Sequence, residues 1–319
     1  MSGVDVSIVV VNWNTRDILS NCLRSVYEQT EHATFEVIVV DNASSDGSQE
    51  MVRRQWPQVR LICNNENRGF AAANNQGIAV ANGRYVLLLN SDTIVLANAI
   101  AKTVKFADDH PEAGVVGCRV LNQDRTLQPT CFMFPSLLNL FLSATYLYKL
   151  FPKNRFFGRE QMTWWSRDDV RSVDVVTGCF MFVRREAIQE VGAMDERFFM
   201  YAEETDWCYR FKQAGWKNLF FPGAEIIHLG GQSTQQVKPQ MILQLKAGIL
   251  RFIRKHRTLP DYAAACLLTS AWFALRVVPW VLAALVGTGQ RHNACVAAKT
   301  YAAGAVKSFG GDKALSVRT

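Results

Sequence analysis

The stretch Tyr85–Thr93, YVLLLNSDT, decides the fold because a wholly apolar run stops abruptly in three polar residues, Asn90, Ser91 and Asp92. A short apolar run of this kind is typical of a strand that a parallel sheet buries on both faces. Gly or Pro would end a strand equally well. A carboxylate after the most apolar strand of the chain therefore needs a chemical reason, which the surrounding sequence has to supply.

Similar apolar runs precede this one and alternate with helical patterns. The patterns predict strands at Val6–Val11, Phe35–Val40, Val59–Ile62 and Arg84–Leu89, and helices at Arg16–Gln29, Gly47–Gln55 and Phe70–Ala81. Strand, helix and strand in this rhythm indicate right-handed crossovers and an open α/β sheet. Ligands of such sheets bind beyond the carboxyl ends of the strands.

All four predicted strands end in polar side chains. These ends are Asn12 and Asn14, then Asp41, then Asn64–Arg68, and finally Asn90–Asp92. One polar strand end is ordinary, since Asn, Asp and Ser favour turns. Four at the same edge of one sheet indicate a site for a polar, phosphorylated ligand.

The next part of the chain continues the α/β pattern less regularly. Residues 132–151 are rich in Leu, Phe and Tyr and are interrupted by Pro135, which favours a core helix or a surface that dips into lipid over a straight membrane span. Further on we expect a strand at Val115–Val120, one at Val173–Arg184 bent at Thr177–Gly178, helices at Arg185–Val191 and Glu203–Ala214, and strands at Asn218–Phe221 and Glu225–His228.

The C-terminal part differs in charge from the rest. Residues 237–319 hold twelve Lys and Arg against two acids, whereas the remainder carries −3 of the total of +7. A basic balance beside apolar runs favours an anionic surface as partner, with membrane lipid ahead of nucleic acid. A merely solubilising tail is the alternative. At Ile242–Lys255 the apolar residues share one helical face, and Lys246 is placed on the polar remainder.

Two uncharged runs in this tail, Tyr262–Leu275 and Val277–Gln290, are separated by Arg276. Neither reaches the roughly 20 residues that a membrane span needs. Joined, they would place Arg276 near the bilayer centre at about 2.5 kcal/mol or more. We therefore expect helices that lie in the interface, and two domains: residues 1–235, and a helical membrane-associating tail at 236–319.

The eight cysteines include no CxxC pair, so neither a zinc knuckle nor a redox motif is expected. Scattered cysteines and a start that leads almost directly into a strand indicate free thiols in a reducing compartment. The sequence thus predicts a cytoplasmic protein that is peripheral on the inner face of the cell membrane.

Seven blocks in order carry a resemblance to a known family. They are VVNWNT, VVDNASSDGS, NENRGFAAANNQG, LLLNSDT, VTGCFMFVRR, GAMDERFFMYAEETDWCYR and IIHLGG, between about Val6 and Ser233. Together they resemble the family 2 glycosyltransferases, most closely the bacterial rhamnosyltransferase-like branch. The resemblance implies a GT-A fold, an α/β open mixed sheet flanked by helices, with a nucleotide-sugar donor and inversion at the anomeric carbon.

The same resemblance gives roles to the strand ends. Asp41 would read the base, since a carboxylate accepts a hydrogen bond from the N3–H of uracil or thymine; an Asx-turn is the structural alternative. The helix that opens near Gly69 would direct amide groups at the nucleotide. Further donor-binding candidates are Asn12, Asn14, Asn67, Arg68, Asn74, Asn90 and Ser91.

Asn90-Ser91-Asp92 stands where similar enzymes carry an Asp-x-Asp motif, which answers the opening question. That motif holds Mg²⁺ or Mn²⁺ against the donor diphosphate, and such ions need only one or two protein carboxylates there. With Asn90 in the first place, Asp92 alone brings full charge. His228 is by resemblance the second metal or diphosphate contact, although a lone His after an apolar strand is usually structural.

The acids Glu203, Glu204 and Asp206 begin a predicted helix, which acids stabilise at its N-terminus. Similar enzymes carry a general base here, which takes the proton of the attacking hydroxyl. The alignment favours Glu204 as this base, with Glu203 or Asp206 as substitutes.

Together, the motifs and the resemblance predict an inverting glycosyltransferase. It would move a sugar, with L-rhamnose one candidate, from a dTDP- or UDP-sugar to a lipid-linked saccharide in cell-surface polysaccharide biosynthesis. An oxidoreductase is disfavoured because no GxGxxG turn follows an early strand. A sugar nucleotidyltransferase and a non-catalytic sugar-nucleotide-binding protein of the same fold remain as alternatives.

Overall fold

The computed structural model describes residues 3–230, 238–286 and 291–316. The chain divides into two compact units, which we describe separately. Unit 1 is Met1–Met133, Trp165–Phe199 and Glu203–Ser233, and unit 2 is Phe134–Trp164, Met200–Ala202 and Thr234–Thr319. The boundary predicted between residues 235 and 236 lies outside the described residues and stays a prediction.

Unit 1 is built on one mixed sheet, whose strands follow the order β3-β2-β1-β4-β8-β6-β9-β5, with β7 paired to β9. The first four strands run parallel, as predicted, whereas β8 is antiparallel to both β4 and β6. The strands are β1 (Val6–Asn12), β2 (Phe35–Asp41), β3 (Arg60–Cys63), β4 (Tyr85–Asn90), β5 (Thr93–Val95), β6 (Ala113–Leu121), β7 (Arg171–Ser172), β8 (Phe180–Arg184) and β9 (Lys217–His228).

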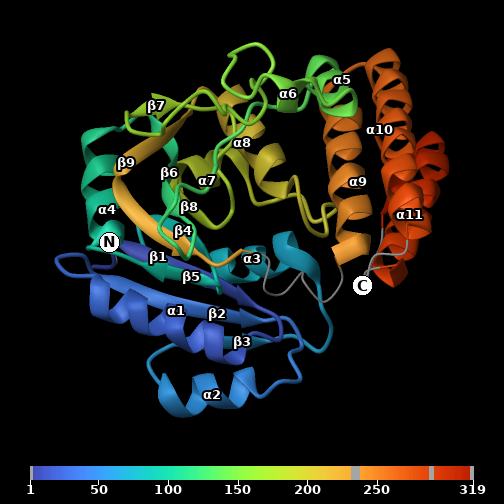
Figure 1. Ribbon diagram of the computed structural model, residues 1–319. Coiled ribbons are helices and arrows are strands. Elements are labelled where there is room, and N and C mark those ends of the chain that lie inside the picture. Colours follow the sequence, from blue (N-terminus) through green and yellow to red (C-terminus); the bar gives the residue numbers. More distant parts are fainter. Residues whose placement is uncertain (1–2, 231–237, 287–290, 317–319) are drawn as a thin grey trace. The chain divides into compact units, whose positions relative to one another are not determined.

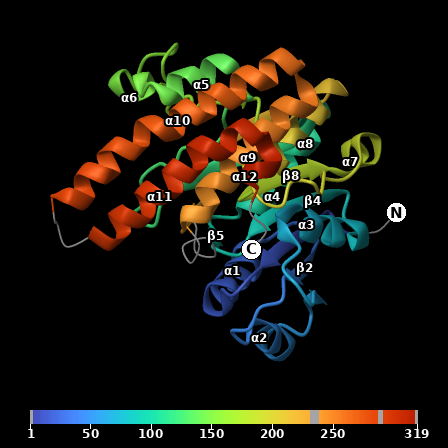
Figure 2. The ribbon, with the colours of Figure 1, turned by 90° about the vertical axis from the view of Figure 1, so that its right-hand side faces the viewer.

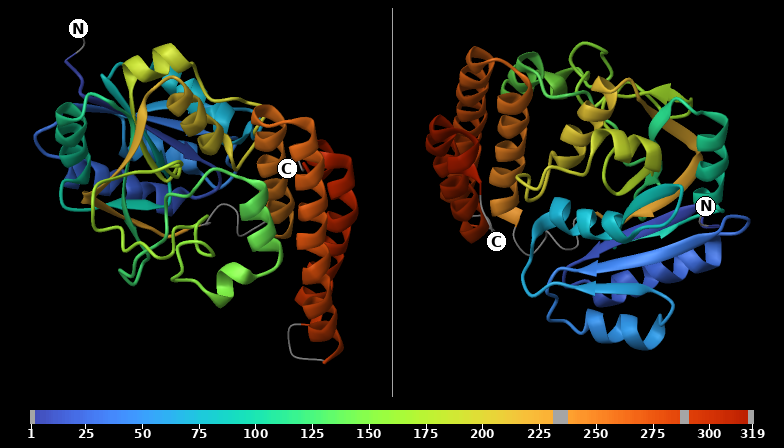
Figure 3. Two further views of the ribbon diagram at one scale, coloured as in Figure 1. Left: turned by 90° about the horizontal axis from the view of Figure 1, so that it is seen from above. Right: turned by 180° about the vertical axis from the view of Figure 1, so that it is seen from behind.

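Helices cover both faces of this sheet (Figure 1). They are α1 (Arg16–Gln29), α2 (Ser48–Gln55), α3 (Gly69–Val80), α4 (Ala99–Asp109), α7 (Arg185–Val191) and α8 (Glu203–Gln213). Side chains of a strand alternate between faces, and β1 shows the consequence. Ile8 and Val10 share a core cluster with Leu19 of α1, whereas Val9 faces Gly77 of α3. Figure 3 shows α1 and α2 on one side of the strands and α3 on the other.

Two predicted strand boundaries were wrong. Of the expected strand Val173–Arg184 only Phe180–Arg184 forms a strand, β8, whereas Val175 makes an isolated bridge to Phe132. The predicted strands at 218–221 and 225–228 are one strand, β9, which pairs with β6 on both sides of Pro222. A register shift between Cys118 and Arg119 of β6 absorbs the irregularity, as a bulge does around a proline.

Unit 2 consists of helices. They are α5 (Leu137–Ala144), α6 (Leu147–Leu150), α9 (Lys238–His256), α10 (Leu259–Leu285), α11 (Arg291–Lys307), the 3₁₀ turn η2 (Ser308–Gly310) and α12 (Gly311–Leu315). Helix α10 packs against α5, α9 and α11 (Figure 2). The apolar segment around residue 140 therefore contributes a helix to this unit, and its buried side chains include Leu140 and Leu142. The carboxylate of Asp312 accepts hydrogen bonds from Arg251, Arg254 and Tyr262, which ties α12 to α9 and α10.

Residues 262–285, which take in the first uncharged run and most of the second, belong to one helix. Helix α10 begins with a capping box between Thr258 and Asp261 and continues through Arg276 and Pro279. Arg276 does not interrupt it, because its guanidinium donates to the carbonyl oxygens of Trp272 (2.9 Å) and Ser143 (3.0 Å). Among the described helices, α10 alone has the length and composition of a membrane span, with 27 residues, a mean hydropathy of 1.6 and 33% of the window buried. By length and composition alone this is weak evidence for a span.

Candidate functional site

The carboxyl ends of the parallel strands meet at one edge of the sheet in unit 1. Asn12 of β1 is in register with Asp41 of β2, and Val11 is in register with Asn90 of β4. At the same edge β5 pairs antiparallel with β9, which sets Thr93 opposite His228. The register thus brings His228, 138 residues away in sequence from Asn90, to the end of β4.

A buried hydrogen-bond network joins these strand ends. The side-chain amide of Asn12 donates to Asp41 Oδ2 at 2.9 Å and to Ser44 Oγ at 3.1 Å. Thr15 Oγ1 donates to Asn12 Oδ1 at 2.7 Å and lies 3.1 Å from Ser91 Oγ. Thr15 was not among the predicted site residues, because one threonine before a helix has no distinctive sequence signal. It connects two of the four predicted strand ends.

Asp41 shapes the loop that follows β2. Its side chain is 1% exposed, and its Oδ1 accepts hydrogen bonds from Ser44 N (2.9 Å) and Gln49 Nε2 (2.8 Å). Asp41 therefore stabilises its own loop, through Ser44 three residues on instead of an Asx-turn, and its reading of the base stays a prediction. Asn14 has the same kind of local role, because it adopts a left-handed φ of 52° and accepts a hydrogen bond from Ser45 N.

The start of α3 is held by close backbone contacts. Asn67 Oδ1 accepts a hydrogen bond from Gly69 N at 3.0 Å, and Phe70 N donates to Phe199 O at 2.7 Å. Gly69 has φ +81°, and a Cβ at this position would collide with the Phe199 carbonyl. Glycine is needed here for both reasons. The contact places the segment that leads to α8 beside the N-terminus of α3.

Arg68 and Asn74, two predicted donor-binding residues near α3, differ in burial. Arg68 is exposed. Asn74 is fully buried and donates to Phe70 O, within its own helix. Its Oδ1 has no hydrogen-bond partner among the described residues. The arrangement supports a packing role for Asn74.

Replacing Gly69 by Ala is expected to destabilise the protein by about 3 kcal/mol, from left-handed strain and the collision with Phe199. Gly47→Ala is the matched control, because Gly47 is left-handed with φ +85° and ψ 11°, and a Cβ there would meet only the Arg16 side chain, at an ordinary contact distance of 3.7 Å. The control is expected to lose about 1 kcal/mol. Urea unfolding of both variants measures the difference, and equal losses would contradict the importance of the contact.

Asp92 and His228 form a pair beside Asn90. Asp92 Oδ1 lies 3.2 Å from His228 Nε2, and Asn90 Nδ2 lies 3.3 Å from the same nitrogen. Gln128 determines the orientation of the ring. Its Nε2 donates to Asn122 Oδ1 and to the His228 carbonyl, so its Oε1 accepts from His228 Nδ1 at 2.7 Å. With Nδ1 as the donor to Gln128, Nε2 is the ring nitrogen that faces Asp92 and Asn90.

These residues fit a divalent cation bound together with a diphosphate. A carboxylate oxygen and an imidazole lone pair that face each other repel unless a proton or a cation lies between them. No group of three or more His, Cys, Asp or Glu side chains is arranged for a metal within the described residues. Mg²⁺ and Mn²⁺ do not require one, because phosphate oxygens and water complete the shell. Asp92 and His228 would hold the ion.

The three acids at the start of α8 have different surroundings. Glu203 is 4% exposed, and burial raises its pKa well above the usual range, with the neighbouring Glu204 carboxylate adding to the rise. Asp206 is fully buried, and its Oδ2 accepts from Arg210 Nε at 2.9 Å. Two adjacent carboxylates whose environments differ in this way separate into a protonated and an ionised member. Glu204 is only half-buried, so burial opposes ionisation more strongly at Glu203 than at Glu204, which favours Glu204 as the base.

One turn connects β4 to α8. Asn90 N donates to Cys179 O at 3.2 Å, and Val176 N donates to Cys208 Sγ of α8 at 3.4 Å. Burial raises the pKa of Cys179 to about 11, and the Asp92 charge adds to the rise. Burial likewise raises the pKa of Cys208, and the Glu204 charge contributes. The charge of Asp92 thus raises the pKa of Cys179, and the charge of Glu204 raises the pKa of Cys208. Residues 176–179 connect these two cysteines through their hydrogen bonds.

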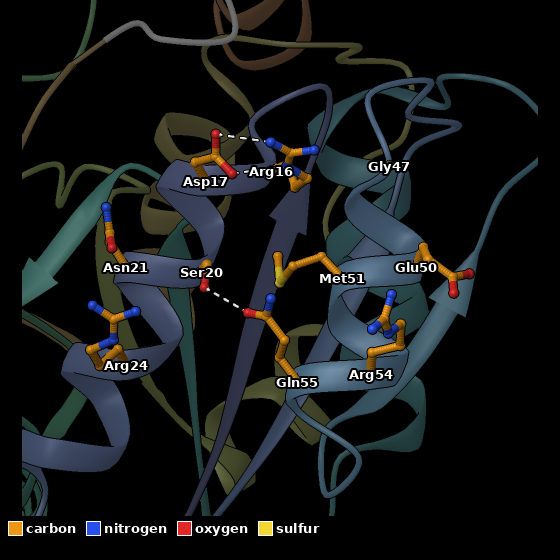
Figure 4. Close-up of a pocket in the computed structure, with 10 residues that line it drawn as sticks. All are labelled: Arg16, Asp17, Ser20, Asn21, Arg24, Gly47, Glu50, Met51, Arg54 and Gln55. Atoms are coloured by element: carbon orange, nitrogen blue, oxygen red, sulfur yellow. Dashed lines mark hydrogen bonds and ion pairs between the residues drawn. The ribbon is translucent and has the colours of Figure 1, made fainter.

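A separate pocket of about 660 Å³ lies between α1 and α2 (Figure 4). None of the predicted site residues lines it. Its arginines include Arg16, which is bonded to Asp17, and Ser20 bonds Gln55 across the pocket. The lining is Arg16, Asp17, Ser20, Asn21, Arg24, Gly47, Glu50, Met51, Arg54 and Gln55. We assign it no part in the site at the strand ends.

The parallel strands with polar carboxyl ends, the antiparallel additions and the Asp92–His228 pair define a GT-A glycosyltransferase. The sequence model of the family "Glycosyl transferase family 2" matches residues 7–192, more than half of the chain, and the chain belongs to this family. The fold, the family and the enzyme class are confirmed as predicted.

Two proteins of related sequence match about 70% of this chain. The N-acetylglucosaminyl-diphospho-decaprenol L-rhamnosyltransferase of Mycobacterium tuberculosis is 29% identical over 241 residues, which cover 71% of this chain and 76% of the relative. The O-antigen biosynthesis protein RfbC of Myxococcus xanthus is 26% identical over 225 residues, which cover 70% of this chain but 17% of that protein.

Solved structures support the fold. The mannosyltransferase PcManGT from Pyrobaculum calidifontis, in complex with GDP-Man and Mn²⁺, has a TM-score of 0.57 and 18% identity, and the match covers 95% of this chain and 86% of that one. GalNAc-T7 with UDP, GalNAc and Mn²⁺ has a TM-score of 0.53 and 17% identity, with 70% of this chain and 43% of that chain covered. Both neighbours were crystallised with a divalent ion.

Proposed function

We propose that this glycosyltransferase moves L-rhamnose, with inversion, from a dTDP- or UDP-linked donor to a lipid-linked saccharide in cell-surface polysaccharide assembly. The observation that carries the proposal is the 29% identity, over most of both chains, to an enzyme named for rhamnose transfer to a decaprenol-linked saccharide. The polar strand ends support a nucleotide donor independently of that relative.

The donor would lie over the carboxyl ends of β1, β2 and β4. Asp41 and Asn12 would contact the base side, and the N-terminus of α3 would direct amide groups at the nucleotide. Asp92 and His228 would hold Mg²⁺ or Mn²⁺. When bound, such an ion neutralises the charge that develops on the departing nucleoside diphosphate. Asn90 would contribute a neutral amide at the same place.

Glu204 would act on the acceptor side. An acceptor hydroxyl attacks the anomeric carbon in line with the leaving group and loses its proton during the attack. A carboxylate that accepts this proton contributes about 10²–10⁴-fold to the rate. Glu203, whose pKa burial raises, would compete less for the proton than Glu204 does.

A direct assay tests the proposal. The full chain is incubated with dTDP-L-rhamnose or other nucleotide sugars, a polyprenyl-diphospho-N-acetylglucosamine acceptor, and Mg²⁺ or Mn²⁺. We expect release of nucleoside diphosphate and a rhamnosylated lipid only when metal and acceptor are both present. Release with another sugar donor alone would overturn the choice of rhamnose, and binding without release would favour a non-catalytic protein.

The surface of α10 supports attachment to a membrane. Its exposed apolar residues include Leu275, Val278, Leu282 and Leu285, which are between 52% and 72% exposed. Their spacing of three and four places them on one face of the helix. We define these four residues as the α10 stripe. A helix with such a face would lie in the interface, on the cytoplasmic side where a nucleotide sugar is available.

Gln128 is proposed as a positioning residue for His228. Replacing Gln128 by Leu is expected to raise the metal concentration needed for half-maximal activity about 10- to 100-fold, because the ring loses its oriented partner. Gln128→Glu retains an acceptor oxygen for Nδ1 and is expected to restore most of the affinity. Metal titrations of initial rate measure this, and an unchanged requirement in Gln128→Leu would remove the positioning role.

A further inference from the structure

The hydroxyl of Thr15, in the turn from β1 to α1, does not cap the helix that it precedes. Thr15 is the N-cap residue of α1, where a threonine oxygen normally accepts a hydrogen bond from an amide of the first turn, but its side chain makes no such bond. The first amide of the helix, that of Arg16, donates to Asp46 Oδ2 at 2.7 Å. Proteins depart from such local rules chiefly at functional sites. The Thr15 hydroxyl therefore has a use outside the helix.

The direction of the hydrogen bonds through Thr15 follows from its neighbours. Asn12 Nδ2 donates to Asp41 Oδ2 and to Ser44 Oγ, so both amide hydrogens of Asn12 are used and its Oδ1 is an acceptor. Thr15 has a single hydroxyl hydrogen, which it donates to Asn12 Oδ1 at 2.7 Å. Ser91 Oγ, 3.1 Å from Thr15 Oγ1, is therefore the donor of the remaining bond. The chain of donors runs from Ser91 through Thr15 and Asn12 to Asp41.

The two ends of this chain depend on Thr15 to different degrees. Asn12 keeps Asp41 and Ser44 as partners whether or not Thr15 has a hydroxyl. For the Ser91 side chain, Thr15 is the one hydrogen-bond partner among the residues that the structure describes. Thr15 and Ser91 are both buried, and a buried hydroxyl that loses its partner is destabilised more than an exposed one. Removing the Thr15 hydroxyl therefore affects Ser91 more than Asn12.

Another buried threonine shows the ordinary use of such a hydroxyl. Thr103 of α4 is fully buried, and its Oγ1 donates to Ala99 O at 2.8 Å within its own helix. This bond is local and joins no second element. Thr15 differs, because it accepts from Ser91, 76 positions away at the end of β4. Ser91 directly precedes Asp92 in the sequence, so the bond holds the residue beside the carboxylate of that strand end.

We propose that Thr15 is a positioning residue of the donor site, which fixes Ser91 and thereby the place of Asp92 toward the metal ion and the diphosphate. The inference rests on the proposed function, because it takes a nucleoside diphosphate and a divalent ion to bind at these strand ends. Without the Thr15 hydroxyl, Ser91 turns to find another partner and Asp92 moves with it. The base side keeps its geometry, since Asn12 retains its bonds to Asp41 and Ser44.

Thr15→Val tests this division, because valine keeps the shape of threonine and lacks the hydroxyl. Binding of dTDP to the full chain is measured by calorimetry, once with Mg²⁺ and once with a chelator. In Thr15→Val we expect the affinity without metal to change by at most about twofold and the affinity with Mg²⁺ to fall about 10- to 100-fold, as for other residues that orient metal ligands. The measured quantity is the factor by which Mg²⁺ tightens dTDP binding.

Three further variants separate positioning from a structural role. Thr15→Ser keeps the hydroxyl and is expected to restore the Mg²⁺ effect. Thr103→Val removes a buried threonine hydroxyl away from the site and is expected to leave the Mg²⁺ effect unchanged. Ser91→Ala removes the same bond from its other end, which keeps the test available if Thr15→Val does not fold. Because Thr15 acts through Ser91, the double variant of Thr15→Val and Ser91→Ala is expected to lose no more of the Mg²⁺ effect than Ser91→Ala alone.

Several results would overturn the inference. They are an equal loss of dTDP affinity with and without Mg²⁺ in Thr15→Val, an unchanged Mg²⁺ effect in that variant, an equal loss in Thr103→Val, no restoration in Thr15→Ser, and additive losses in the double variant. A Mg²⁺ effect absent from the original protein would also overturn it. None of these measurements uses the transfer reaction. An original protein that binds dTDP with Mg²⁺ but transfers no rhamnose would refute the proposed function and leave the role of Thr15 standing.

Discussion

Replacing Asp92 by Ala is expected to abolish measurable turnover, with kcat reduced at least about 10³-fold even at saturating Mg²⁺ or Mn²⁺. This loss corresponds to about 4 kcal/mol of transition-state stabilisation. The reason is that Asp92 is the single carboxylate of the Asn90-Ser91-Asp92 end of β4, and it lies 3.2 Å from His228 Nε2. Without it, the position keeps an imidazole and an amide, which bring no negative charge for a cation.

Asn90→Asp is the matched control for this variant. It adds a second carboxylate beside His228 and is expected to keep activity and to lower the metal concentration required. Circular dichroism and thermal unfolding establish that both variants are folded. An Asp92→Ala enzyme that retains most of its turnover would remove the metal role of Asp92, and an Asn90→Asp enzyme that needs more metal would contradict the shared position of the two residues.

Replacing Glu204 by Gln is expected to lower kcat by about 10²–10⁴-fold, with donor affinity and metal requirement unchanged. The amide keeps the shape of the side chain but cannot accept the proton of the acceptor hydroxyl. Single-turnover rates together with calorimetric binding of the donor separate the chemical step from binding. A Glu204→Gln enzyme that transfers at the original rate would refute the assignment.

The neighbouring acids provide the controls. Glu203→Gln is expected to have little effect on rate, because burial raises the pKa of Glu203 and an amide resembles the protonated acid. Asp206→Asn is expected to destabilise the protein by about 3 kcal/mol, because it breaks a buried ion pair with Arg210. If Glu203→Gln lost the rate and Glu204→Gln did not, the two roles would be exchanged.

Local patterns were sufficient for the N-terminal α/β half. The predicted helices Arg16–Gln29 and Arg185–Val191 have the observed bounds, and the first four strands agree to within one or two residues. Short apolar runs between amphipathic helices admit few arrangements, because crossovers are right-handed and parallel strands are buried. The polar strand ends could therefore be assigned to one edge before any coordinates were known.

Pairing between segments that are far apart in the sequence could not be predicted from local patterns. The interruption between β7 and β8 depends on bonds from residues 176–179 to Asn90 and Cys208. The continuity of β9 depends on its register with β6. Helix α10 passes through Arg276 because Ser143, 133 positions away, accepts from the guanidinium. Each of these depends on a partner that the local sequence does not contain.

The sequence by itself determined the α/β class, the family and the acid at the end of β4, because strand and helix periods and turn chemistry are local properties. The tertiary structure decided which groups act together. It placed Gln128 within hydrogen-bond distance of His228 Nδ1. It also buried Glu203 more deeply than Glu204 and packed Lys246 against the Trp272 ring. Burial and the alignment of distant groups control charge, and they exist only once the chain has folded.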